Sequence, residues 1–318
     1  MLTTTNAHTP VFLQEAVAAL NVRPEGVYLD GTLGRAGHSQ KILEQLNDDG
    51  RLVALDRDMA AIEVGKEVFS GDERVLLMHG DFAHLEDVLE RQSGENKPTG
   101  FDGILLDLGV SSPQLDQAER GFSFMREGDL DMRMDNTQGQ TAAQWLASAE
   151  EVEIANVIYQ LGEEKFSRRI ARAIVAQRIE EPITTTSQLV ALLEEAIPRK
   201  EKNKHPATRT FQAIRMHIND ELGQLKSVLP QAVRLLNDGG RLSVISFHSL
   251  EDRVVKRFFR ELSKGKSLPK HIPIVEEYQA PLTTVGKALK PSAEEIQRNP
   301  RSRSAVLRVA QRTGVAYE

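Results

Sequence analysis

Short apolar runs recur along the first third of the chain, and each is followed by a segment with the spacing of an amphipathic helix. Four runs end at or just before an aspartate, namely Asp30, Asp56, Asp81 and Asp107. Runs this short and this apolar are typical of strands buried on both faces of a parallel sheet. Helical segments lie between them, as crossover connections require, at 39–46, 59–69 and 83–91. The pattern predicts an α/β fold with a mostly parallel sheet.

The alternation stops after about residue 119 and gives way to helical spacing alone. Helices are predicted at 141–147, 150–161, 164–179 and 186–197. The later part of the chain predicts a long helix at 207–236, a strand at 241–247, a basic amphipathic helix at 250–263 and an edge strand at 304–310. We therefore expect an all-helical domain at 120–212, inserted into an α/β domain made of 1–119 and 213–318.

The turn after the first strand carries three glycines. Gly31, Gly34 and Gly37 follow Asp30 and precede the first crossover helix. Glycine lets a backbone approach a ligand closely, and a helix N-terminus presents free N–H groups. Asp56 follows Gly37 by 56 − 37 = 19 positions, close to the roughly 20 at which an acid binds ribose hydroxyls. This predicts a nucleoside-binding corner, and the alternative is a turn whose glycines serve packing only.

The four aspartates are expected to converge, because the carboxyl ends of parallel strands share one sheet edge, where ligands bind. The loop after Asp107 adds Ser111, Ser112 and Gln114 beside that edge. A single acid at a strand end means little, but four in succession indicate a binding crevice. Phe82 follows a strand and a glycine, so its ring is placed either to cover a flat purine or to fill the core.

The composition restricts the chemistry open to the chain. Its 318 residues include no cysteine, which excludes disulfides, thiolate zinc sites and cysteine nucleophiles. Residues 1–10 carry no signal-peptide pattern, and no apolar run approaches the roughly 20 residues of a membrane span. We expect a cytoplasmic protein that does not associate with membranes.

Positive charge is concentrated in three stretches, although the net charge is −6. The stretches are 165–178, 199–215 and 298–312. Such segregation in an acidic chain is consistent with contact with a polyanion, while each stretch alone is more typical of a solvated helix face. The residues predicted to bind nucleic acid are Arg168, Arg169, Arg172, Lys204, Arg209, Arg301 and Arg303.

Several motifs resemble those of one enzyme family. They are Asp30-Gly31-Thr32 with Gly34, Gly37 and His38, then Leu55-Asp56-Arg57-Asp58, Asp107 to Gln114, Gly121-Phe122-Ser123-Phe124, His205 to Arg209, and Ser246 to Arg253. Over almost its whole length the chain resembles the bacterial ribosomal RNA small subunit methyltransferase H family, which methylates the exocyclic N4 amine of a cytosine.

The resemblance implies a class I S-adenosylmethionine-dependent methyltransferase fold, Rossmann-like, with a helical insertion that recognises substrate. The implied substrate is 16S ribosomal RNA in the decoding region of the small ribosomal subunit. The implied cofactor-binding residues are Ala36, Gly37 and His38 at the methionine end, Asp56 at the ribose, Phe82 at the adenine, and Asp107 and Gln114. The family usually has glycine where this chain has Ala36, so binding through that backbone requires a negative φ there.

Methyl transfer from a sulfonium is an in-line displacement that needs no metal and no covalent enzyme intermediate. The cytosine amine is a poor nucleophile because its lone pair is delocalised into the ring. Acceptors for its N–H bonds are expected to localise that pair. The predicted catalytic residues are Asp107, Ser112 and Pro113. Phe122, Phe124 and Phe247 are alternative stacking faces for an extruded base, and His248 is either a proton acceptor or structural.

Three other interpretations share parts of this pattern. A nicotinamide dehydrogenase would use the same corner, but the spacing here is G-x-x-G-x-x-G and not the dinucleotide fingerprint G-x-G-x-x-G. A catalytically silent RNA-binding assembly factor would keep the pocket for stability alone. A methyltransferase acting on DNA, protein or a small molecule would have the same fold. The oligomeric state stays open, with a homodimer as one alternative.

Overall fold

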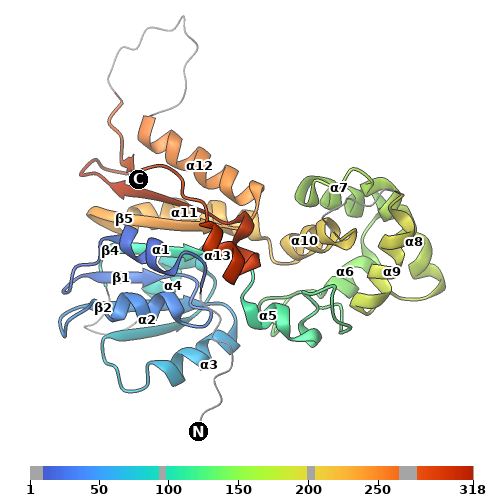
Figure 1. The fold of residues 1–318 in the computed structure, drawn as a ribbon, viewed down its shortest axis with the longest axis horizontal. Helices are drawn as coiled ribbons and strands as arrows, with labels where there is room; N and C mark the ends of the chain where they lie inside the picture. The colour runs from blue at the N-terminus through green and yellow to red at the C-terminus, as the bar shows by residue number, and fades with distance from the viewer. Residues whose placement is uncertain (1–9, 93–97, 199–204, 265–277, 318) are drawn as a thin grey trace, which may run out of the picture. The chain divides into compact units, whose positions relative to one another are not determined.

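The computed structural model describes residues 10–92, 98–198, 205–264 and 278–317. The chain forms two compact units (Figure 1). The first consists of Met1–Gly109 and Leu222–Glu318, and the second of Val110–Glu221. The second unit extends beyond the predicted insertion, 120–212, at both ends. Within the described ranges, no helix combines the length and apolar composition needed to cross a bilayer.

The described part of the first unit contains a seven-stranded sheet. Its strands are β1 (Val27–Asp30), β2 (Arg51–Asp56), β3 (Val75–His79), β4 (Phe101–Asp107), β5 (Leu236–Ser246), β6 (Leu282–Thr284) and β7 (Val306–Arg312). The spatial order is β3-β2-β1-β4-β5-β7-β6. Strands β1 to β5 pair in parallel, whereas β7 is antiparallel to both of its neighbours. This confirms the predicted mostly parallel sheet and puts its topological switch point between β1 and β4.

Helices cover both faces of this sheet (Figure 1). They are α1 (Leu13–Leu20), α2 (Gly37–Leu43), α3 (Met59–Val68), α4 (Leu85–Glu90), α11 (Glu221–Leu235), α12 (Ser249–Lys264) and α13 (Ala293–Arg298), with 3₁₀ turns η1 (Phe82–His84) and η3 (Pro300–Ser304). On β4, Ile104 belongs to the apolar cluster that includes α4, α11 and α12, and Leu105 to the cluster of α1 and α2. Because both faces are buried, the strands carry continuous apolar runs.

The second unit has a hydrophobic core of its own. Its elements are α5 (Ser112–Asp116), η2 (Ala118–Arg120), α6 (Ala142–Ser148), α7 (Glu151–Gly162), α8 (Ser167–Glu180), α9 (Thr186–Ala196) and α10 (Ala207–Ile218). Each helix from α6 to α10 contributes at least one fully or nearly buried side chain to one cluster, namely Trp145, Ile158, Ile174, Leu193 and Phe211. The four helices predicted between 141 and 197 are confirmed, with ends displaced by up to three residues.

Two predictions about individual elements are wrong. The helix predicted over 207–236 is two helices, α10 and α11, which are interrupted where Asp220 adopts a left-handed φ of 44°. The tail strand is not at the sheet edge, because β7 lies between β5 and β6. Strand β6 has only three residues, Leu282–Thr284, too short a run to produce a periodic signal in the sequence.

Asn219 fixes the irregular segment before α6 to the end of α10. Its side-chain oxygen accepts the N–H of Met134 at 2.8 Å, and its amide nitrogen donates to the carbonyls of Met132 at 2.7 Å and Arg215 at 2.8 Å. Met132 has a left-handed φ of 63°, which is unfavourable for an L-residue by about 1–2 kcal/mol. Buried hydrogen bonds from Asn219 offset that strain.

We predict that Asn219→Ala destabilises the second unit, because two buried backbone groups, the N–H of Met134 and the carbonyl of Met132, lose their bonds to this side chain. The expected decrease in the free energy of unfolding is about 3 kcal/mol. Urea denaturation followed by the fluorescence of Trp145, the only tryptophan, reports on this unit directly. Asn237→Ala is the matched control, since Asn237 is exposed and makes one bond, to Asp102 at 3.2 Å. Equal midpoints for the two variants would contradict the role given to Asn219.

Candidate active site

Three carboxylates meet at the carboxyl ends of β2, β1 and β4, the strands around the switch point. Asp56 ends β2, Asp30 ends β1 and Asp107 ends β4. After burial, the charge of Asp30 is among the causes that raise the pKa of both Asp56 and Asp107, as expected for neighbouring acids. Asp81, the fourth predicted acid, accepts the N–H of Ala83 and thereby starts η1. The edge therefore gathers three acids at the strand ends, and Asp81, two residues after β3, also lies 3.9 Å from Arg57, which follows β2.

Asp30 has a structural role in the turn after β1. Its side chain is fully buried, and its two oxygens accept the Ser39 hydroxyl at 2.6 Å and the Thr32 N–H at 3.1 Å. The Thr32 hydroxyl in turn accepts the N–H of Asp107 at 2.7 Å. These bonds tie the turn after β1 to the end of β4 and hold the two sides of the crevice in register.

Ala36 adopts a left-handed conformation with φ 64°. The negative φ that cofactor binding through this backbone would require is therefore not present. This conformation is unfavourable for alanine, but the methyl group is fully buried in a cluster with Leu33 and Ile62, which offsets part of the strain. The Ala36 N–H donates to the Leu33 carbonyl at 2.7 Å. It is therefore already bonded within the turn.

Gly37 begins α2, and its lack of a side chain serves packing. A Cβ at this position would collide with the ring of Pro10. Packing thus accounts for one glycine of the corner, as the structural alternative predicted. Gly37 and His38 are the first residues of α2, so their N–H groups have no carbonyl partner inside the helix and are oriented to meet an acceptor.

Asp56 is held in place by two backbone N–H groups. Gly34 donates to one carboxylate oxygen at 2.8 Å and Asp58 to the other at 2.9 Å. Burial raises the pKa of Asp56 to about 6, although both N–H groups favour the ionised form. Each oxygen keeps a further lone pair. The side chain can therefore accept from a ligand diol while the turn keeps it oriented.

His38 and Asp107 face each other across the crevice. Nε2 of His38 lies 3.2 Å from the Val11 carbonyl, which can only accept, so the proton is on Nε2 and Nδ1 is bare. Nδ1 lies 3.7 Å from Oδ2 of Asp107. Burial lowers the pKa of His38, and burial followed by the charges of Asp30 and Glu251 raises the pKa of Asp107 well above its ordinary value.

The other oxygen of Asp107, Oδ1, is buried and has no hydrogen-bond partner among the described residues. A buried carboxylate oxygen without a partner is energetically unfavourable. With the bare Nδ1 of His38 nearby, the groups around the Asp107 side chain are acceptors. It is therefore suited to a ligand that brings N–H donors or positive charge.

Glu251 is a residue at this edge to which the sequence assigned no role. It is 2% exposed, and one of its oxygens accepts the N–H groups of Phe247 at 2.8 Å and His248 at 3.3 Å. His248 accepts the N–H of Glu251 through Nδ1 at 3.4 Å, and its Nε2 lies 3.1 Å from the second Glu251 oxygen. The pair caps α12, and a proton-accepting role for His248 stays a prediction. Glu251 is an acid three positions after His248, the residue before α12, and this spacing was the signal for a helix cap in the sequence.

The predicted residues Ser112, Pro113 and Gln114 lie in the second unit, at the start of α5. Gln114 is buried, and its side-chain oxygen accepts the N–H of Ser111 at 2.9 Å. This closes a capping box, in which each side chain satisfies the other residue's backbone. The observed role of Gln114 is to cap α5, and its role toward a cofactor stays a prediction.

The predicted aromatic residues have different surroundings. Phe82 is partly buried and packs against the main core of the first unit. Phe122 is buried below the guanidinium of Arg120, and Phe124 stacks on His205 with ring centroids 4.8 Å apart.

Phe247 follows β5 in the first unit and is partly buried. Its ring borders Gly109, where an added Cβ would lie 3.6 Å from a ring carbon. Gly109 is two positions after Asp107, so Phe247 is the predicted stacking residue that the structure brings to the strand-tip edge.

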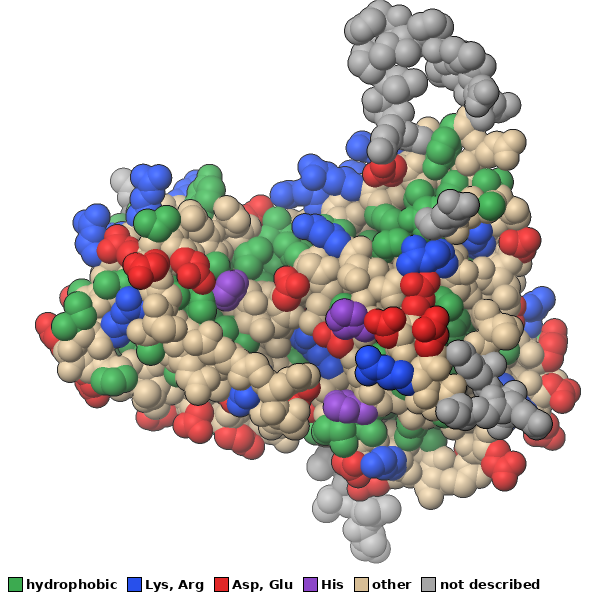
Figure 2. Space-filling model, turned by 180° about the vertical axis from the view of Figure 1, so that it is seen from behind, with side chains coloured by type: hydrophobic (Ala, Val, Ile, Leu, Met, Phe, Trp, Pro, Cys, Tyr) green, Lys and Arg blue, Asp and Glu red, His purple; other side chains and the backbone are tan. Residues whose placement is uncertain are grey.

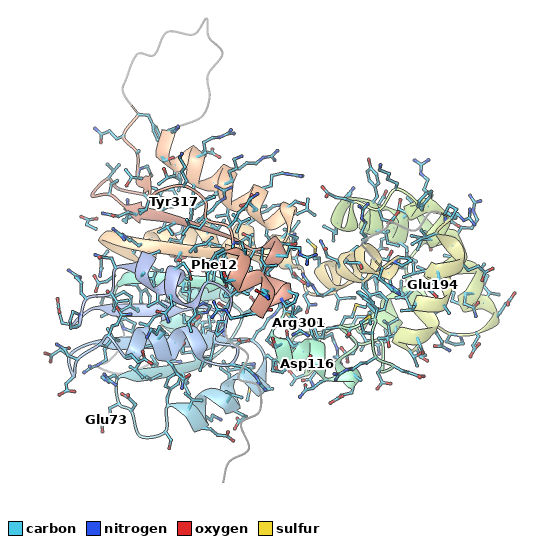
Figure 3. All side chains as sticks on the ribbon, in the orientation of Figure 1. Phe12, Glu73, Asp116, Glu194, Arg301 and Tyr317 are labelled. Carbon is cyan, nitrogen blue, oxygen red and sulfur yellow. The ribbon has the colours of Figure 1, made fainter. Side chains whose placement is uncertain are left out.

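The predicted nucleic-acid-binding residues are divided between the units. Arg168, Arg169 and Arg172 are exposed on α8, and Arg209 on α10 donates to the Glu163 carbonyl at 3.0 Å. Arg301 and Arg303 are exposed in η3 of the first unit, where Figure 3 labels Arg301. Lys204 lies outside the described residues. On the face shown in Figure 2, Lys and Arg side chains are interspersed with Asp and Glu.

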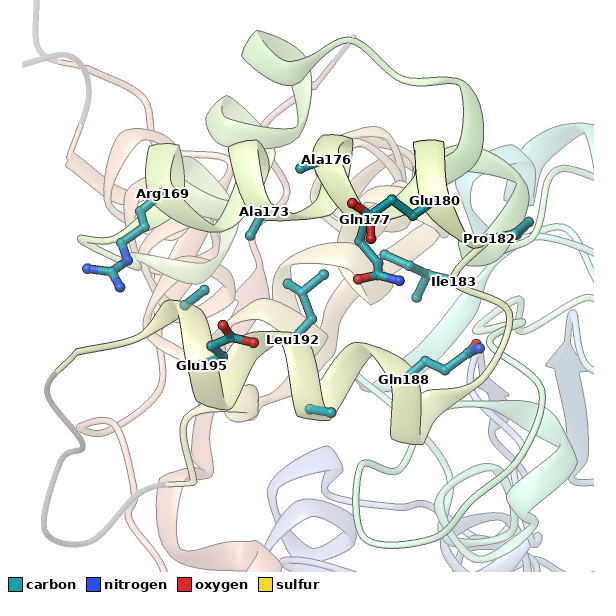
Figure 4. Close-up of a pocket in the computed structure, with 12 residues that line it drawn as sticks. Arg169, Ala173, Ala176, Gln177, Glu180, Pro182, Ile183, Gln188, Leu192 and Glu195 are labelled. Carbon is teal, nitrogen blue, oxygen red and sulfur yellow. The ribbon is translucent and has the colours of Figure 1, made fainter.

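A groove of about 520 Å³ lies between α8 and α9 of the second unit (Figure 4). Ala173, Ala176 and Leu192 line its apolar part, with Arg169 and Glu195 among its polar residues. Its charges are mixed, and none of the strand-tip carboxylates lines it. The groove is therefore separate from the acceptor site.

Fold and site together define a Rossmann-like α/β protein with buried acceptor groups at the switch point of its sheet, where proteins of this fold bind nucleotides. The model of the MraW methylase family matches residues 5–313 of the chain. The chain belongs to this family.

Its relatives include three proteins called ribosomal RNA small subunit methyltransferase H. The relative from Pseudoalteromonas atlantica is 55% identical over 98% of this chain and 100% of its own length. Those from Nitrosospira multiformis and Shewanella halifaxensis are each 56% identical over 96% of this chain, and cover 97% and 96% of their own lengths.

The family is one of S-adenosylmethionine-dependent methyltransferases, which confirms the predicted cofactor, and the order of the sheet confirms the predicted Rossmann-like fold. The residues present fit that molecule. It carries donors on its ribose, adenine amine and ammonium and positive charge on its sulfur, and the site offers acceptors at Asp56 and Asp107. When bound, it supplies an electrophilic methyl group.

We predict that binding of S-adenosylmethionine weakens as the pH falls through about 6, because protonation of Asp56 removes the charged acceptor for the ribose. The dissociation constant should rise by up to about tenfold per pH unit below that point. In Asp56→Asn, affinity should already be lower at pH 8, by roughly 10- to 100-fold, and this pH dependence should disappear.

Isothermal titration calorimetry between pH 5 and 8 measures both effects. Asp87→Asn is the control, since Asp87 is an exposed carboxylate on α4 of the same unit. If Asp56→Asn bound S-adenosylmethionine with the affinity and the pH dependence of the parent, the assignment of Asp56 to the ribose would be refuted.

Proposed function

We propose that this enzyme transfers the methyl group of S-adenosylmethionine to the exocyclic N4 amine of a cytosine in 16S ribosomal RNA. The proposed target lies in the decoding region of the small ribosomal subunit, in the cytoplasm. The observation that carries this proposal is the pair of acceptors at Asp107 and His38, where Oδ1 of Asp107 is buried without a partner among the described residues. An exocyclic amine presents N–H donors to such a site. The relatives' name supports small-subunit ribosomal RNA as the class of substrate.

In this function Asp107 accepts one N–H of the cytosine amine through Oδ1. The sequence assigns the second N–H to the loop of Ser112 and Pro113, and this role stays a prediction. Held from both sides, the amine directs its lone pair away from the ring, toward the methyl donor. The nitrogen would gain a bond to the methyl carbon as the bond from that carbon to sulfur breaks, and it must lose a proton, which an ionised Asp107 accepts. A positively charged cofactor favours that ionised form, since opposite charge lowers the pKa of a carboxyl.

Phe247 is the stacking face that we assign to the target base. It lies at the end of β5 and borders Gly109, close in sequence to Asp107. Stacking on an aromatic ring holds an extruded base in plane for attack. Phe122 and Phe124 already contact Arg120 and His205, so neither ring is assigned this role.

The second unit is assigned to substrate recognition, as the sequence predicts for a helical insertion. Its exposed cations Arg168, Arg169 and Arg172 lie along α8, and Arg209 lies on α10. Arginine pairs with phosphate through two parallel hydrogen bonds, which suits a structured RNA. The roles of Phe82, Gln114, Lys204, Arg301 and Arg303, and a homodimeric state, stay predictions.

The direct test is to map the modified nucleotide. The purified protein is incubated with S-adenosylmethionine labelled on its methyl group and with small subunits that lack the modification. We expect one label per subunit, recovered by mass spectrometry as N4-methylcytosine in the decoding region. Label on another base or on protein would overturn the proposed specificity. RNA binding without label would instead favour the silent assembly factor.

We predict that reversing Arg168, Arg169 and Arg172 together to glutamate weakens binding to small subunits by roughly tenfold or more, because phosphate contacts are replaced by repulsion. Cofactor affinity, measured by calorimetry, should remain at the parental level, since α8 lies outside the first unit. The matched control replaces the same three residues by lysine, which keeps the charge. Undiminished turnover of the glutamate variant on subunits would show that this face of α8 is only solvated.

A further inference from the structure

Helix α12 carries a feature that the proposed function does not yet use, because its two faces differ in character. Val255 and Phe259 are buried, and Phe258 and Leu262 pack, partly buried, against the main core of the first unit. The helix contacts β5, β6 and β7. This packing fixes the rotation of the helix and therefore determines which residues face outward.

The outer face of α12 is a line of cations. The exposed, positively charged residues are Arg253, Lys256, Arg257, Arg260 and Lys264. Their spacing of three, one, three and four positions keeps them on one side of a helix. At about 1.5 Å per residue, the line is about 16 Å long. Glu261 is the only acid from 253 to 264, and the preceding Asp252 pairs with Arg308 on β7 at 2.6 Å.

Other helices of the first unit mix their surface charges. Lys41 pairs with Glu44 on α2, and Lys66 pairs with Glu63 on α3, both at 2.7 Å and three positions apart. Such mixing is typical of a solvated face. Like charges three and four positions apart repel, so the α12 line weakens its own helix. A polyanion lying on it would remove that repulsion.

The position of α12 connects this line to the candidate active site. The helix begins where β5 ends, at the sheet edge that also holds the ends of β1, β2 and β4. Its first turn contains Glu251, whose charge contributes to the raised pKa of Asp107. A nucleic-acid backbone bound along α12 therefore has one end at the acceptor site.

The outer face of α12 does not have the composition of a membrane-binding surface. Interfacial helices insert large apolar side chains beside their cations. Among the described residues, the exposed large apolar side chains belong to other segments and none lies on α12. Charge without exposed apolar surface favours a phosphodiester backbone over a lipid surface.

We propose that the cations of α12 bind backbone phosphates of the substrate RNA close to the target nucleotide, as a second RNA-binding surface in addition to α8. This deepens the proposed function and rests on it for the identity of the RNA. The surface belongs to the unit that holds the cofactor pocket. Its role is to position the target strand at the cofactor pocket, whereas the second unit selects the nucleotide to be methylated.

The test compares the full chain with a variant carrying Lys256→Gln, Arg257→Gln and Arg260→Gln. Binding of a fluorescent RNA stem-loop with the decoding-region sequence is measured by anisotropy between roughly 50 and 200 mM salt. Each phosphate contact contributes roughly 0.7–0.9 to the slope of the logarithm of the binding constant against the logarithm of the salt concentration. We expect the dissociation constant to rise by about tenfold or more and the salt slope to fall by about 2 to 3. Thermal stability and S-adenosylmethionine affinity should stay at the parental level.

The matched control removes three cations elsewhere on the same unit, the partly exposed Lys41 and the exposed Lys66 and Arg91, through Lys41→Gln, Lys66→Gln and Arg91→Gln. An α12 variant that loses no more RNA affinity than this control would overturn the proposal. The proposal would also be overturned if both proteins bound RNA equally well and only the parent floated with phosphatidylglycerol vesicles. Binding is measured without turnover, so a failure to find N4-methylcytosine would remove the proposed reaction and leave the α12 result interpretable.

Discussion

Acidic side chains buried at the ends of three adjacent strands are the constraint on which the first unit depends. Removing a carboxylate from water is unfavourable unless hydrogen bonds or positive charge compensate. Asp30 is compensated inside the turn by Ser39 and Thr32, and Asp56 by the N–H groups of Gly34 and Asp58. Asp107 keeps one buried oxygen without a partner among the described residues. The carboxylates of the turn after β1 thus have their hydrogen bonds within the protein. Oδ1 of Asp107 is the acceptor that favours a positively charged methyl donor and an amine.

In the proposed function, the two units carry different parts of the task. The second has a complete core of its own around residues such as Trp145 and Ile174, so its surface can change without disturbing the cofactor pocket. Cations are grouped on α8 in that unit and on α12 in the first, in a chain whose net charge is −6. This grouping of cations concentrates the attraction for a polyanion on α8 and α12. The acidic residues of the rest of the chain limit non-specific binding to nucleic acid. Recognition and chemistry can then be altered separately by substitution.

The sequence predicted the parallel sheet and the helical second unit because their signals are local and periodic: apolar runs such as 101–107 and helical spacing such as 186–196. It also placed Asp30, Asp56 and Asp107 at one edge, since topology alone requires this. It could not predict the φ of Ala36, which depends on the closure of a whole turn, or the break at Asp220. It assigned no role to Glu251, because the burial of that acid beside Asp107 arises from tertiary packing. The three-residue strand β6 lacked a period to detect.

A crystal structure of the chain with bound S-adenosylmethionine tests the central claim most directly, since it locates every part of the cofactor at once. We expect the ribose hydroxyls on the carboxylate of Asp56, the methionine end at the start of α2 near Gly37, and the methyl-bearing sulfur facing Asp107. A cofactor found in any other part of the molecule, or one that leaves Asp56 and Asp107 without a contact, would contradict the assignment of the strand-tip acids as its binding site.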